Sequence, residues 1–304
     1  GCEIGLRPID LHLSSLRLMG AQIETEGGVL SCRCPDGLHG EKITLSFPSV
    51  GATENILIAA ASADGETVIL NAAREPEIAD LADFLCSCGA HISGAGSGEI
   101  TVCGMKKLHS AEHTVIPDRI IASTYMAAAA VTGGDVRILD TRAEHITPVI
   151  PVFEQAGCKV DCGENSVHIS APVRLRSVQT VRTMPYPGFP TDSQAAVMAM
   201  LSVAHGTSVM IENIFENRYR HVRELCRLGA DIMTEGKVAV IKGVETLTGA
   251  CVCAADLRAG TALAVAGLAA QGSTTIENVC LIDRGWQDME EKLRSLGAEI
   301  ERES

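Results

Sequence analysis

A short phrase made of a hydrophobic residue, a glycine and then alanine or cysteine recurs five times along the 304 residues. Its glycines are Gly20, Gly89, Gly157, Gly229 and Gly297, which lie 69, 68, 72 and 68 residues apart. A nearly fixed period of this length is typical of a chain built from repeated supersecondary units. Each phrase closes an amphipathic stretch, so we expect helices that end at a left-handed glycine, each followed by an alternating strand.

A second pattern marks the first half of each unit. An alanine-rich stretch ends at glycine and a short strand follows, at 65–70, 134–139, 206–211 and 272–276. A full unit therefore reads helix, strand, helix and a pair of strands, which predicts parallel or mixed sheets covered by helices. Four first halves accompany five second halves, so we expect a longer protein that has lost its N-terminal part. A genuinely shortened chain is the alternative.

Composition restricts both the core and the partners. The chain is 46% hydrophobic but only 3% aromatic, so the core must be built from Ala, Val, Ile and Leu. A net charge of −13 argues against nucleic acid as a partner, because neutralising its phosphates needs a basic surface. A small anionic substrate remains compatible with this charge, since a few converging arginines suffice to bind it. No apolar stretch is long enough to span a bilayer, so we expect no membrane segment.

The twelve cysteines include three Cys-x-Cys pairs, at 32/34, 86/88 and 251/253. This spacing matches neither a zinc site nor a thioredoxin motif, so we expect no metal. The chain does not begin with a secretory signal. We therefore expect reduced, mostly structural thiols in a cytoplasmic protein. The sequence carries no signal of oligomeric state.

Arginines recur where each strand leads into the next helix. Arg7 and Arg284 both lie 13 residues before the glycine of their repeat. The other junctions carry Arg74, Arg142 and Arg218. Because strand ends that lead into helix N-termini are natural anion sites, the pattern predicts a pocket for phosphates or carboxylates. Solvated loop charge is the alternative for any one of them.

Cys2 stands between Gly1 and Gly5, with Arg7 close behind. A thiol in glycine-rich backbone near a guanidinium group can become acidic enough to react. Taken alone, it could equally be a small apolar thiol near a chain end.

Three further segments place polar residues at the start of an alanine-rich helix; they are Phe47–Glu54, Pro187–Gln194 and Asp256–Thr261. In the first segment exposed amides and hydroxyls could hold a phosphate, or Ser49 or Thr53 could simply cap the helix. Asp192 either caps the helix that begins at Gln194 or serves in catalysis. The residues alone leave both alternatives open.

Together these residues resemble the UDP-N-acetylglucosamine enolpyruvyl transferases, also called UDP-N-acetylglucosamine 1-carboxyvinyltransferases. The resemblance is collinear along the chain and rests on the phrases Gly1–His12, Ala73–Ile78, Phe215–Arg218 and Ile282–Gly285. It implies a two-domain inside-out α/β barrel built from these repeats, with about the first one and a half repeats missing. Residues 1–116 would form the truncated first lobe and 117–304 the second lobe of three repeats, with the active site in the cleft between them.

The resemblance assigns catalytic roles to Cys2, Asp192 and Arg284, and substrate-binding roles to further arginines. Cys2 is similar to the loop cysteine that protonates the methylene carbon of phosphoenolpyruvate and that fosfomycin alkylates. Asp192 is similar to the base that accepts the proton of the sugar 3-hydroxyl. Arg7 and Arg284 correspond to arginines around the phosphoenolpyruvate, and Arg258 to a further arginine of the cleft. No metal or organic cofactor is implied.

The resemblance also implies two stretches that contact the sugar nucleotide, with Ile214 near the uridine. The first stretch consists of Arg7, Pro8, Ile9, Asp10 and Leu11. The second consists of Phe47, Pro48, Ser49, Val50 and Gly51.

The implied reaction transfers the enolpyruvyl group of phosphoenolpyruvate to the 3-hydroxyl of UDP-N-acetylglucosamine and releases phosphate, the first committed step of peptidoglycan precursor synthesis. The chain departs from the resemblance because an N-terminal lysine, an asparagine and a further arginine of those enzymes have no counterpart here. A non-catalytic sugar-nucleotide binder is therefore the alternative. The shikimate-pathway enolpyruvyl transferase shares the repeats, but its loop chemistry does not use a Gly-Cys segment.

Overall fold

The structure is a computed structural model that describes residues 8–105 and 107–303. The chain divides into two compact units. We call the described part of residues 8–116, together with Pro185–Pro187, the N-terminal unit. We call Pro117–Met184 together with residues 188–303 the C-terminal unit. Each unit has its own hydrophobic core.

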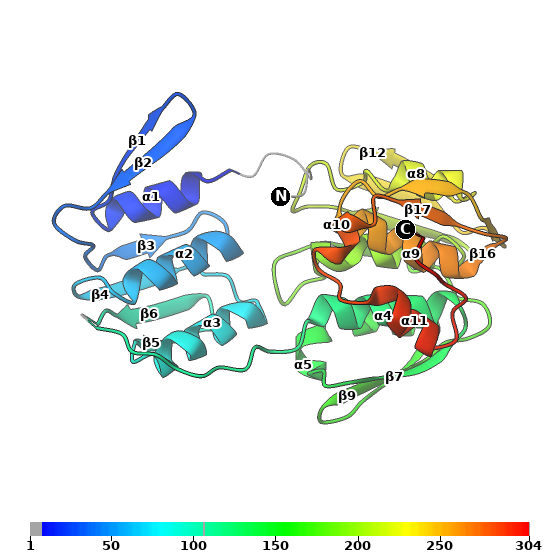
Figure 1. Cartoon of the computed structure of the whole chain (residues 1–304), viewed down its shortest axis with the longest axis horizontal. Helices are drawn as coiled ribbons and strands as arrows, with labels where there is room; N and C mark the ends of the chain where they lie inside the picture. Colours follow the sequence, from blue (N-terminus) through cyan, green and yellow to red (C-terminus); the bar gives the residue numbers. More distant parts are fainter. Residues whose placement is uncertain (1–7, 106, 304) are drawn as a thin grey trace. The chain divides into compact units, whose positions relative to one another are not determined.

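The N-terminal unit contains one complete repeat and the second half of another (Figure 1). Its four-stranded sheet has the order β3-β4-β6-β5, in which β3 and β4 are parallel and the other pairs antiparallel. Helix α2 packs on both α1 and α3, and β1 and β2 form a separate hairpin. The elements are α1 Asp10–Leu18, β1 Gln22–Glu26, β2 Val29–Arg33, β3 Lys42–Thr44, α2 Val50–Ala60, β4 Glu66–Leu70, α3 Pro76–Ser87, β5 His91–Ser93 and β6 Glu99–Cys103.

The C-terminal unit contains three repeats. Its sheets have the orders β7-β9-β8 and β10-β11-β13-β12, and two parallel pairs, β14-β16 and β15-β17, complete the set. The elements of the first two repeats are α4 Arg119–Val131, β7 Asp135–Leu139, α5 Ala143–Ile146, α6 Ile150–Gln155, β8 Lys159–Cys162, β9 Ser166–Ser170, β10 Thr180–Arg182, η1 Thr191–Ser193, α7 Gln194–Leu201, β11 Thr207–Ile211, α8 Val222–Arg227, β12 Asp231–Glu235 and β13 Val238–Lys242. The elements of the third are β14 Leu247–Thr248, β15 Cys251–Cys253, α9 Leu257–Ala269, β16 Ala270–Gln271, β17 Thr275–Glu277, α10 Cys280–Asp283 and α11 Met289–Ser295.

The core of this unit is a set of three alanine-rich helices, α4, α7 and α9, which pack against one another. Every residue of α7 is buried. Small side chains allow the helix axes to approach closely, and the sheets then cover the outside of the helices. The predicted arrangement, with helices inside and mixed sheets outside, is confirmed in this unit.

The repeat glycines adopt the predicted conformation. Gly20, Gly89, Gly157, Gly229 and Gly297 have φ values of 100°, 101°, 99°, 93° and 100°. Each lies two residues after the last residue of a helix, where a residue with a Cβ atom would be strained. The repeat is therefore a repeated backbone geometry as well as a repeated sequence phrase.

A side-chain hydrogen bond recurs around four of these glycines. The residue three positions before the glycine donates to the carbonyl group three positions after it, which ties the helix end to the next segment. The bonds run from Arg17 to Ile23 at 3.2 Å, Cys86 to Ile92 at 3.9 Å, Cys226 to Ile232 at 3.8 Å and Arg294 to Ile300 at 2.8 Å. The repeat of Gly157 has Glu154 at this position, which cannot donate as a carboxylate.

Three expectations were wrong. The left-handed glycine that ends α4 is Gly133 (φ 66°) and not Gly134. No strand follows Gly297 within residues 298–303; there the carbonyl group of Ile300 accepts from Arg294 instead of from a partner strand. The cysteines are free, but eight of the eleven that the structure describes are exposed, so most do not pack in a core.

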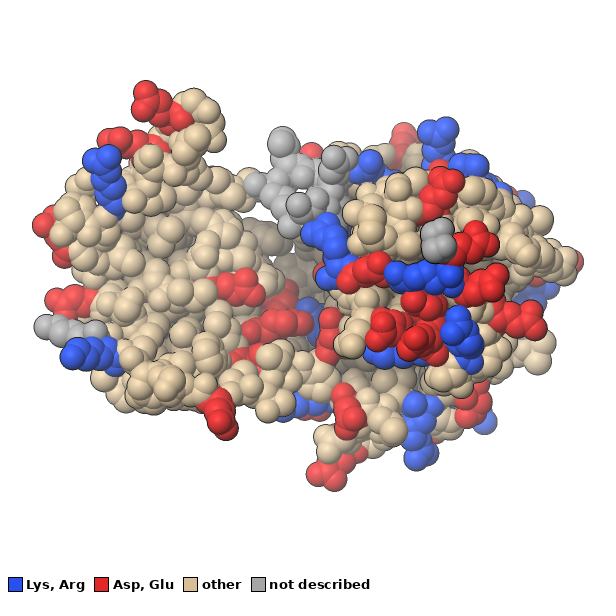
Figure 2. All heavy atoms as spheres, in the orientation of Figure 1, with Lys and Arg blue, Asp and Glu red and all other residues tan. Residues whose placement is uncertain are grey.

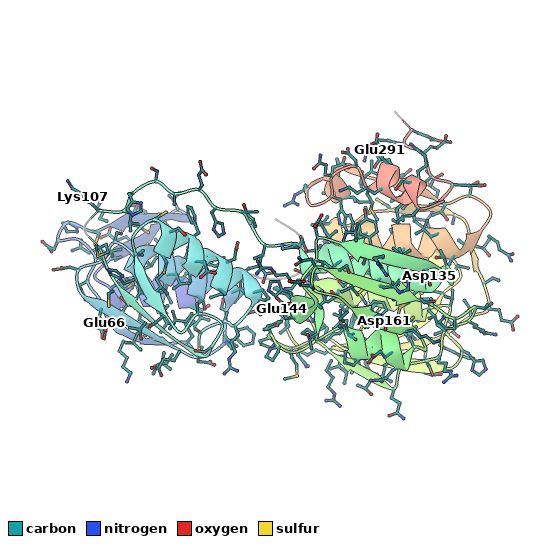
Figure 3. All side chains as sticks on the ribbon, turned by 90° about the horizontal axis from the view of Figure 1, so that it is seen from below. Glu66, Lys107, Asp135, Glu144, Asp161 and Glu291 are labelled. Atoms are coloured by element: carbon teal, nitrogen blue, oxygen red, sulfur yellow. The ribbon has the colours of Figure 1, made fainter. Side chains whose placement is uncertain are left out.

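Surface charge is unevenly distributed. On the face shown in Figure 2, lysines and arginines are interspersed with acidic residues on the C-terminal unit, and the N-terminal unit is largely uncharged. On the sheet β7-β9-β8, His168 lies 2.8 Å from Asp135 and 3.8 Å from Asp161, the two acidic residues labelled there in Figure 3. The hydrogen bond from His168 lowers the pKa of Asp135. Among the described helices, none is long and apolar enough to cross a bilayer.

Close backbone contacts predict which glycines are indispensable for stability. A Cβ atom on Gly243 would lie 1.6 Å from the carbonyl oxygen of Ala204, so G243A must displace backbone. We expect it to lower the free energy of unfolding by about 3 kcal/mol. In α9, a Cβ on Gly267 would meet Thr274 at an ordinary 3.4 Å, so G267A should stabilise by about 0.5–1 kcal/mol. Urea denaturation of both variants tests this, and equal stabilities would contradict it.

Candidate active site

Asp192 lies in η1, directly before the buried helix α7. Its carboxylate accepts a short hydrogen bond from Arg218 and lies 3.4 Å from the guanidinium group of Arg258. Ser193, not Asp192, is the N-cap residue of α7. Of the two alternatives for Asp192, the helix cap is therefore not observed, since its carboxylate contacts the two arginines; its catalytic role stays a prediction. Its side chain keeps 42% exposure, so a substrate can reach it.

Arg218 holds this carboxylate from the buried side. Its side chain is only 3% exposed, and it also donates to the carbonyl group of Thr191 at 3.3 Å. The ring of Phe215 lies 5.6 Å from the guanidinium carbon, within the range of a cation–π contact. The sequence pattern predicted Arg218 to be one of several arginines around an anion pocket, but it did not pair this residue with Asp192. The sequence signal for Arg218 was the phrase Phe215–Arg218, on which the family resemblance partly rests.

The two arginines determine the charge of Asp192. Burial acts to raise its pKa, but the charges of Arg258 and Arg218 and their hydrogen bonds outweigh burial and hold the pKa below its ordinary value. The carboxylate is therefore ionised at neutral pH, and with both arginines in contact it is a weaker base than an ordinary aspartate. A substrate carboxylate or phosphate that drew the arginines toward itself would raise this pKa and make Asp192 a stronger base.

Asp256 holds the backbone of Arg258 at the start of α9. It is the N-cap residue of α9, and its carboxylate accepts from the amides of Arg258 and Ala259, each at 2.9 Å. His221 is also buried, and burial lowers its pKa to about 4, with Arg218 also lowering it and Asp256 acting in the opposite direction. His221 is therefore neutral at physiological pH.

The buried His221 predicts acid sensitivity. Its pKa is about 4 in the folded state against 6.5 for an ordinary histidine, so the unfolded chain binds more protons between these values. The free energy of unfolding should therefore fall as pH drops from 6.5 to 4, by on the order of 3 kcal/mol from this residue. Urea titrations across that range should show a flatter dependence for H221Q and an unchanged one for H205Q, an exposed control. Parallel curves for wild type and H221Q would contradict the prediction.

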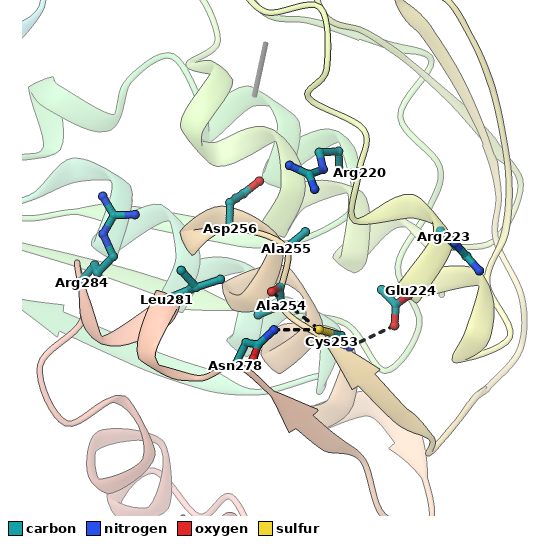
Figure 4. Close-up of a pocket in the computed structure, with 10 residues that line it drawn as sticks. All are labelled: Arg220, Arg223, Glu224, Cys253, Ala254, Ala255, Asp256, Asn278, Leu281 and Arg284. Atoms are coloured by element: carbon teal, nitrogen blue, oxygen red, sulfur yellow. Dashed lines mark hydrogen bonds between the residues drawn. The ribbon is translucent and has the colours of Figure 1, made fainter. Parts of the chain in front are cut away.

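Arg284 lies at the end of α10 and lines a cavity of about 650 Å³. Asp256 lines the same cavity, together with Arg220, Arg223, Cys253 and Asn278 (Figure 4). The amide of Asn278 donates to the sulfur of Cys253 at 3.0 Å, and Glu224 accepts from the amide of Cys253. Three guanidinium groups in one cavity suit an anionic ligand. Arg284 and Asp256 therefore line the same cavity. Because Asp256 also accepts from the backbone amide of Arg258, this cavity lies next to the start of α9.

The two predicted nucleotide-contacting stretches lie at neighbouring helix starts in the N-terminal unit. Pro8 and Ile9 precede α1, which begins at Asp10, and Ser49 is the N-cap residue of α2, accepting from the amide of Ala52 at 3.3 Å. The side chains of His12 in α1 and Asn55 in α2 are hydrogen-bonded, so the helices are in contact. Of the two alternatives for the cap, Ser49 is correct. Phe47, two residues before Ser49, is 42% exposed.

Two predicted site residues, Cys2 and Arg7, lie outside the described residues, so their roles stay predictions. Ile214 follows β11 with its amide donating 2.8 Å to the carboxyl group of Glu212. Within residues 8–105 and 107–303, the structure contains no group of three His, Cys, Asp or Glu side chains placed to hold a metal ion.

Sequence comparison identifies the family to which this repeated α/β fold belongs. The EPSP synthase (3-phosphoshikimate 1-carboxyvinyltransferase) family matches residues 1–293. UDP-N-acetylglucosamine 1-carboxyvinyltransferase 1 of Caldanaerobacter subterraneus subsp. tengcongensis is 54% identical over 302 residues, 99% of this chain and 72% of its own. The enzyme of Finegoldia magna is 50% identical, with 99% and 72% covered. The chain therefore belongs to this family of carboxyvinyltransferases.

Solved structures agree with this assignment. The enolpyruvyl transferase NikO from Streptomyces tendae superposes with a TM-score of 0.88 at 26% identity, covering 97% of this chain and 72% of its own. An EPSP synthase from Acinetobacter baumannii gives a TM-score of 0.74 at 24% identity over 97% and 72%, which shows the fold alone. The predicted fold class is confirmed. The chain spans about 72% of the length of these relatives.

Proposed function

We propose that the chain transfers the enolpyruvyl group of phosphoenolpyruvate to the 3-hydroxyl of UDP-N-acetylglucosamine and releases phosphate, in peptidoglycan precursor synthesis. The observation that carries the proposal is the ionised carboxylate of Asp192, held by Arg218 and Arg258 at the start of α7. Relatives named for transfer to this sugar nucleotide, at 50% identity or more, support the choice of acceptor.

Each proposed role follows from the chemistry of the residue. Asp192 accepts the proton of the sugar 3-hydroxyl while the hydroxyl oxygen bonds to the central carbon of phosphoenolpyruvate. At the same time Cys2 gives its proton to the methylene carbon. A proton then passes from the resulting methyl group back to the Cys2 thiolate, which restores the double bond as the C–O bond to phosphate breaks and phosphate leaves. Arg258 and Arg284, with Arg7, would neutralise the carboxylate and the departing phosphate through paired hydrogen bonds. No step requires a metal or an organic cofactor.

The proposed sugar-nucleotide contacts come from the starts of α1 and α2 and from Ile214. The stretches 7–11 and 47–51 would supply backbone amides and side chains at two adjacent helix N-termini, a natural place for the diphosphate. The location of the active site in a cleft between two lobes stays a prediction. We also propose a cytoplasmic location, in keeping with the free thiols of the described cysteines.

One assay separates transfer from mere binding. Phosphate release is measured on mixing the chain with phosphoenolpyruvate and UDP-N-acetylglucosamine, alone and with the additional N-terminal segment of a longer relative supplied in trans. Release in either case, together with fosfomycin labelling of Cys2 detected by mass spectrometry, is expected. Sugar-nucleotide binding without release or labelling would favour the non-catalytic binder. Release with shikimate 3-phosphate as the acceptor would favour the shikimate-pathway reaction.

A further inference from the structure

We infer that Glu212 is a positioning residue that maintains the geometry of the contact between Asp192 and Arg218. This inference rests on the proposed function. Glu212 follows directly on β11 and is 1% exposed. A carboxyl group this deeply buried is costly unless its oxygens are fully hydrogen-bonded.

Its hydrogen bonds are complete and come from three separate segments. One oxygen accepts from the Thr183 hydroxyl at 2.9 Å and from the amides of Ile214 and Phe215 at 2.8 and 3.1 Å. The other oxygen accepts from the Thr191 hydroxyl at 2.9 Å. Thr183 in turn accepts from the amide of Asn213, so its hydroxyl hydrogen is directed to Glu212. All four partners donate, which suits a carboxylate.

These bonds reach both members of the catalytic ion pair. Thr191 is the chain neighbour of Asp192, and its carbonyl group accepts from Arg218 at 3.3 Å. Phe215 carries the ring that lies 5.6 Å from the guanidinium carbon of Arg218. Glu212 therefore fixes the backbone beside the base through one oxygen and the aromatic support of the arginine through the other. Neither contact touches the substrate, so the role is one of positioning.

Comparison among the repeats shows that Glu212 departs from a common pattern. The equivalent residues, six positions after the glycine that precedes each strand, are Asn71, Asp140 and Asn278, and these have φ values of 55°, 50° and 59°. Asn71 binds the neighbouring strand end at Leu45, and Asn278 binds Cys253. Glu212 makes the equivalent link to Thr183 without a positive φ, and its longer side chain also reaches Thr191. The helix start of this repeat carries Asp192, the proposed base, whereas Asp118 and Asp256 in two other repeats cap their helices.

Two substitutions test the inference. T191V removes the hydroxyl group that Glu212 holds and preserves side-chain shape, whereas E212Q keeps the size and replaces one acceptor oxygen by a donor. We expect kcat to fall by about 100-fold in E212Q and about tenfold in T191V, with smaller changes in KM for phosphoenolpyruvate. The acid limb of the kcat–pH profile should also move, because the Asp192–Arg218 geometry changes.

The matched control is S208A. Ser208 lies on the same strand, is 1% exposed, and accepts from the amide of Val178 at 2.9 Å, so S208A removes a comparable buried bond away from the site. It should lower stability without changing kcat or the pH profile. If E212Q and T191V behave like S208A, the inference is wrong.

A second measurement separates this inference from the proposed function. If the wild-type chain releases no phosphate under any condition, the proposed function fails, and the inference is then tested by crystal structures of wild type and E212Q. Loss of the Asp192–Arg218 contact in E212Q would support positioning. An unchanged contact would overturn it.

Discussion

Replacing Asp192 with asparagine is expected to lower the rate of phosphate release by about 1,000-fold. The amide cannot accept the proton of the sugar hydroxyl, yet its oxygen can still accept a hydrogen bond from Arg218. Because Arg218 is only 3% exposed, removing the charge of Asp192 leaves a buried cation unpaired, and we expect D192N to lower the free energy of unfolding by about 3 kcal/mol. Initial rates at saturating substrates and urea denaturation of D192N measure the two effects separately.

The control for this variant is D231N. Asp231 is a 51%-exposed aspartate of the same unit, 4.0 Å from Lys242, and its charge should not affect the reaction. D231N should release phosphate at the wild-type rate. A rate for D192N within about tenfold of wild type would remove Asp192 from the role of base.

Replacing Arg218 with lysine is expected to reduce kcat/KM by about 100-fold. Lysine keeps the positive charge but loses the planar guanidinium group, whose Nη2 nitrogen contacts both Asp192 and Thr191 and whose carbon lies 5.6 Å from the centre of the Phe215 ring. Since the hydrogen bond from Arg218 helps to lower the pKa of Asp192, losing that bond in R218K should raise the pKa. The acid limb of the rate profile should therefore move to higher pH, which rates measured from pH 4 to 8 would show.

An exposed arginine supplies the control. Arg174 is 42% exposed and lies 3.6 Å from Glu245, so R174K makes the same chemical change in a solvated ion pair. It should change neither the rate nor the pH profile. If R218K also left both unchanged, Arg218 would be a structural cation only.

The repeat was readable from sequence because its signal is local. A helix that ends in a left-handed turn needs glycine, so Gly89 or Gly229 fixes a helix end by itself. The choice between Gly133 and Gly134 was not readable, since two adjacent glycines satisfy the same requirement. The exposed cysteines were misread because hydrophobic neighbours in a strand alternate between faces, and Cys251 points to the solvent side.

The site was only partly readable because its geometry depends on residues far apart in sequence. Asp192 before an alanine-rich helix fits both a cap and a base, and only the positions of Arg218 and Arg258 exclude the cap. Glu212 carried no sequence signal, since its four partners come from segments up to 29 residues away. The resemblance named Asp192 and Arg258 separately as site residues, and the structure places their charged groups 3.4 Å apart. The catalytic roles of all the site residues stay predictions.

The wholly buried helix α7 has a consequence for isotope exchange. Its amides lie between α4 and α9, so deuterium can reach them only when those helices separate, which amounts to opening the entire unit. The hairpin of β1 and β2, exposed along nearly its whole length, should exchange within the shortest labelling time. Ser193, at the start of α7, is hydrogen-bonded to Ser123 of α4 at 2.7 Å. The proposed base is thus attached directly to a segment that we expect to exchange slowly.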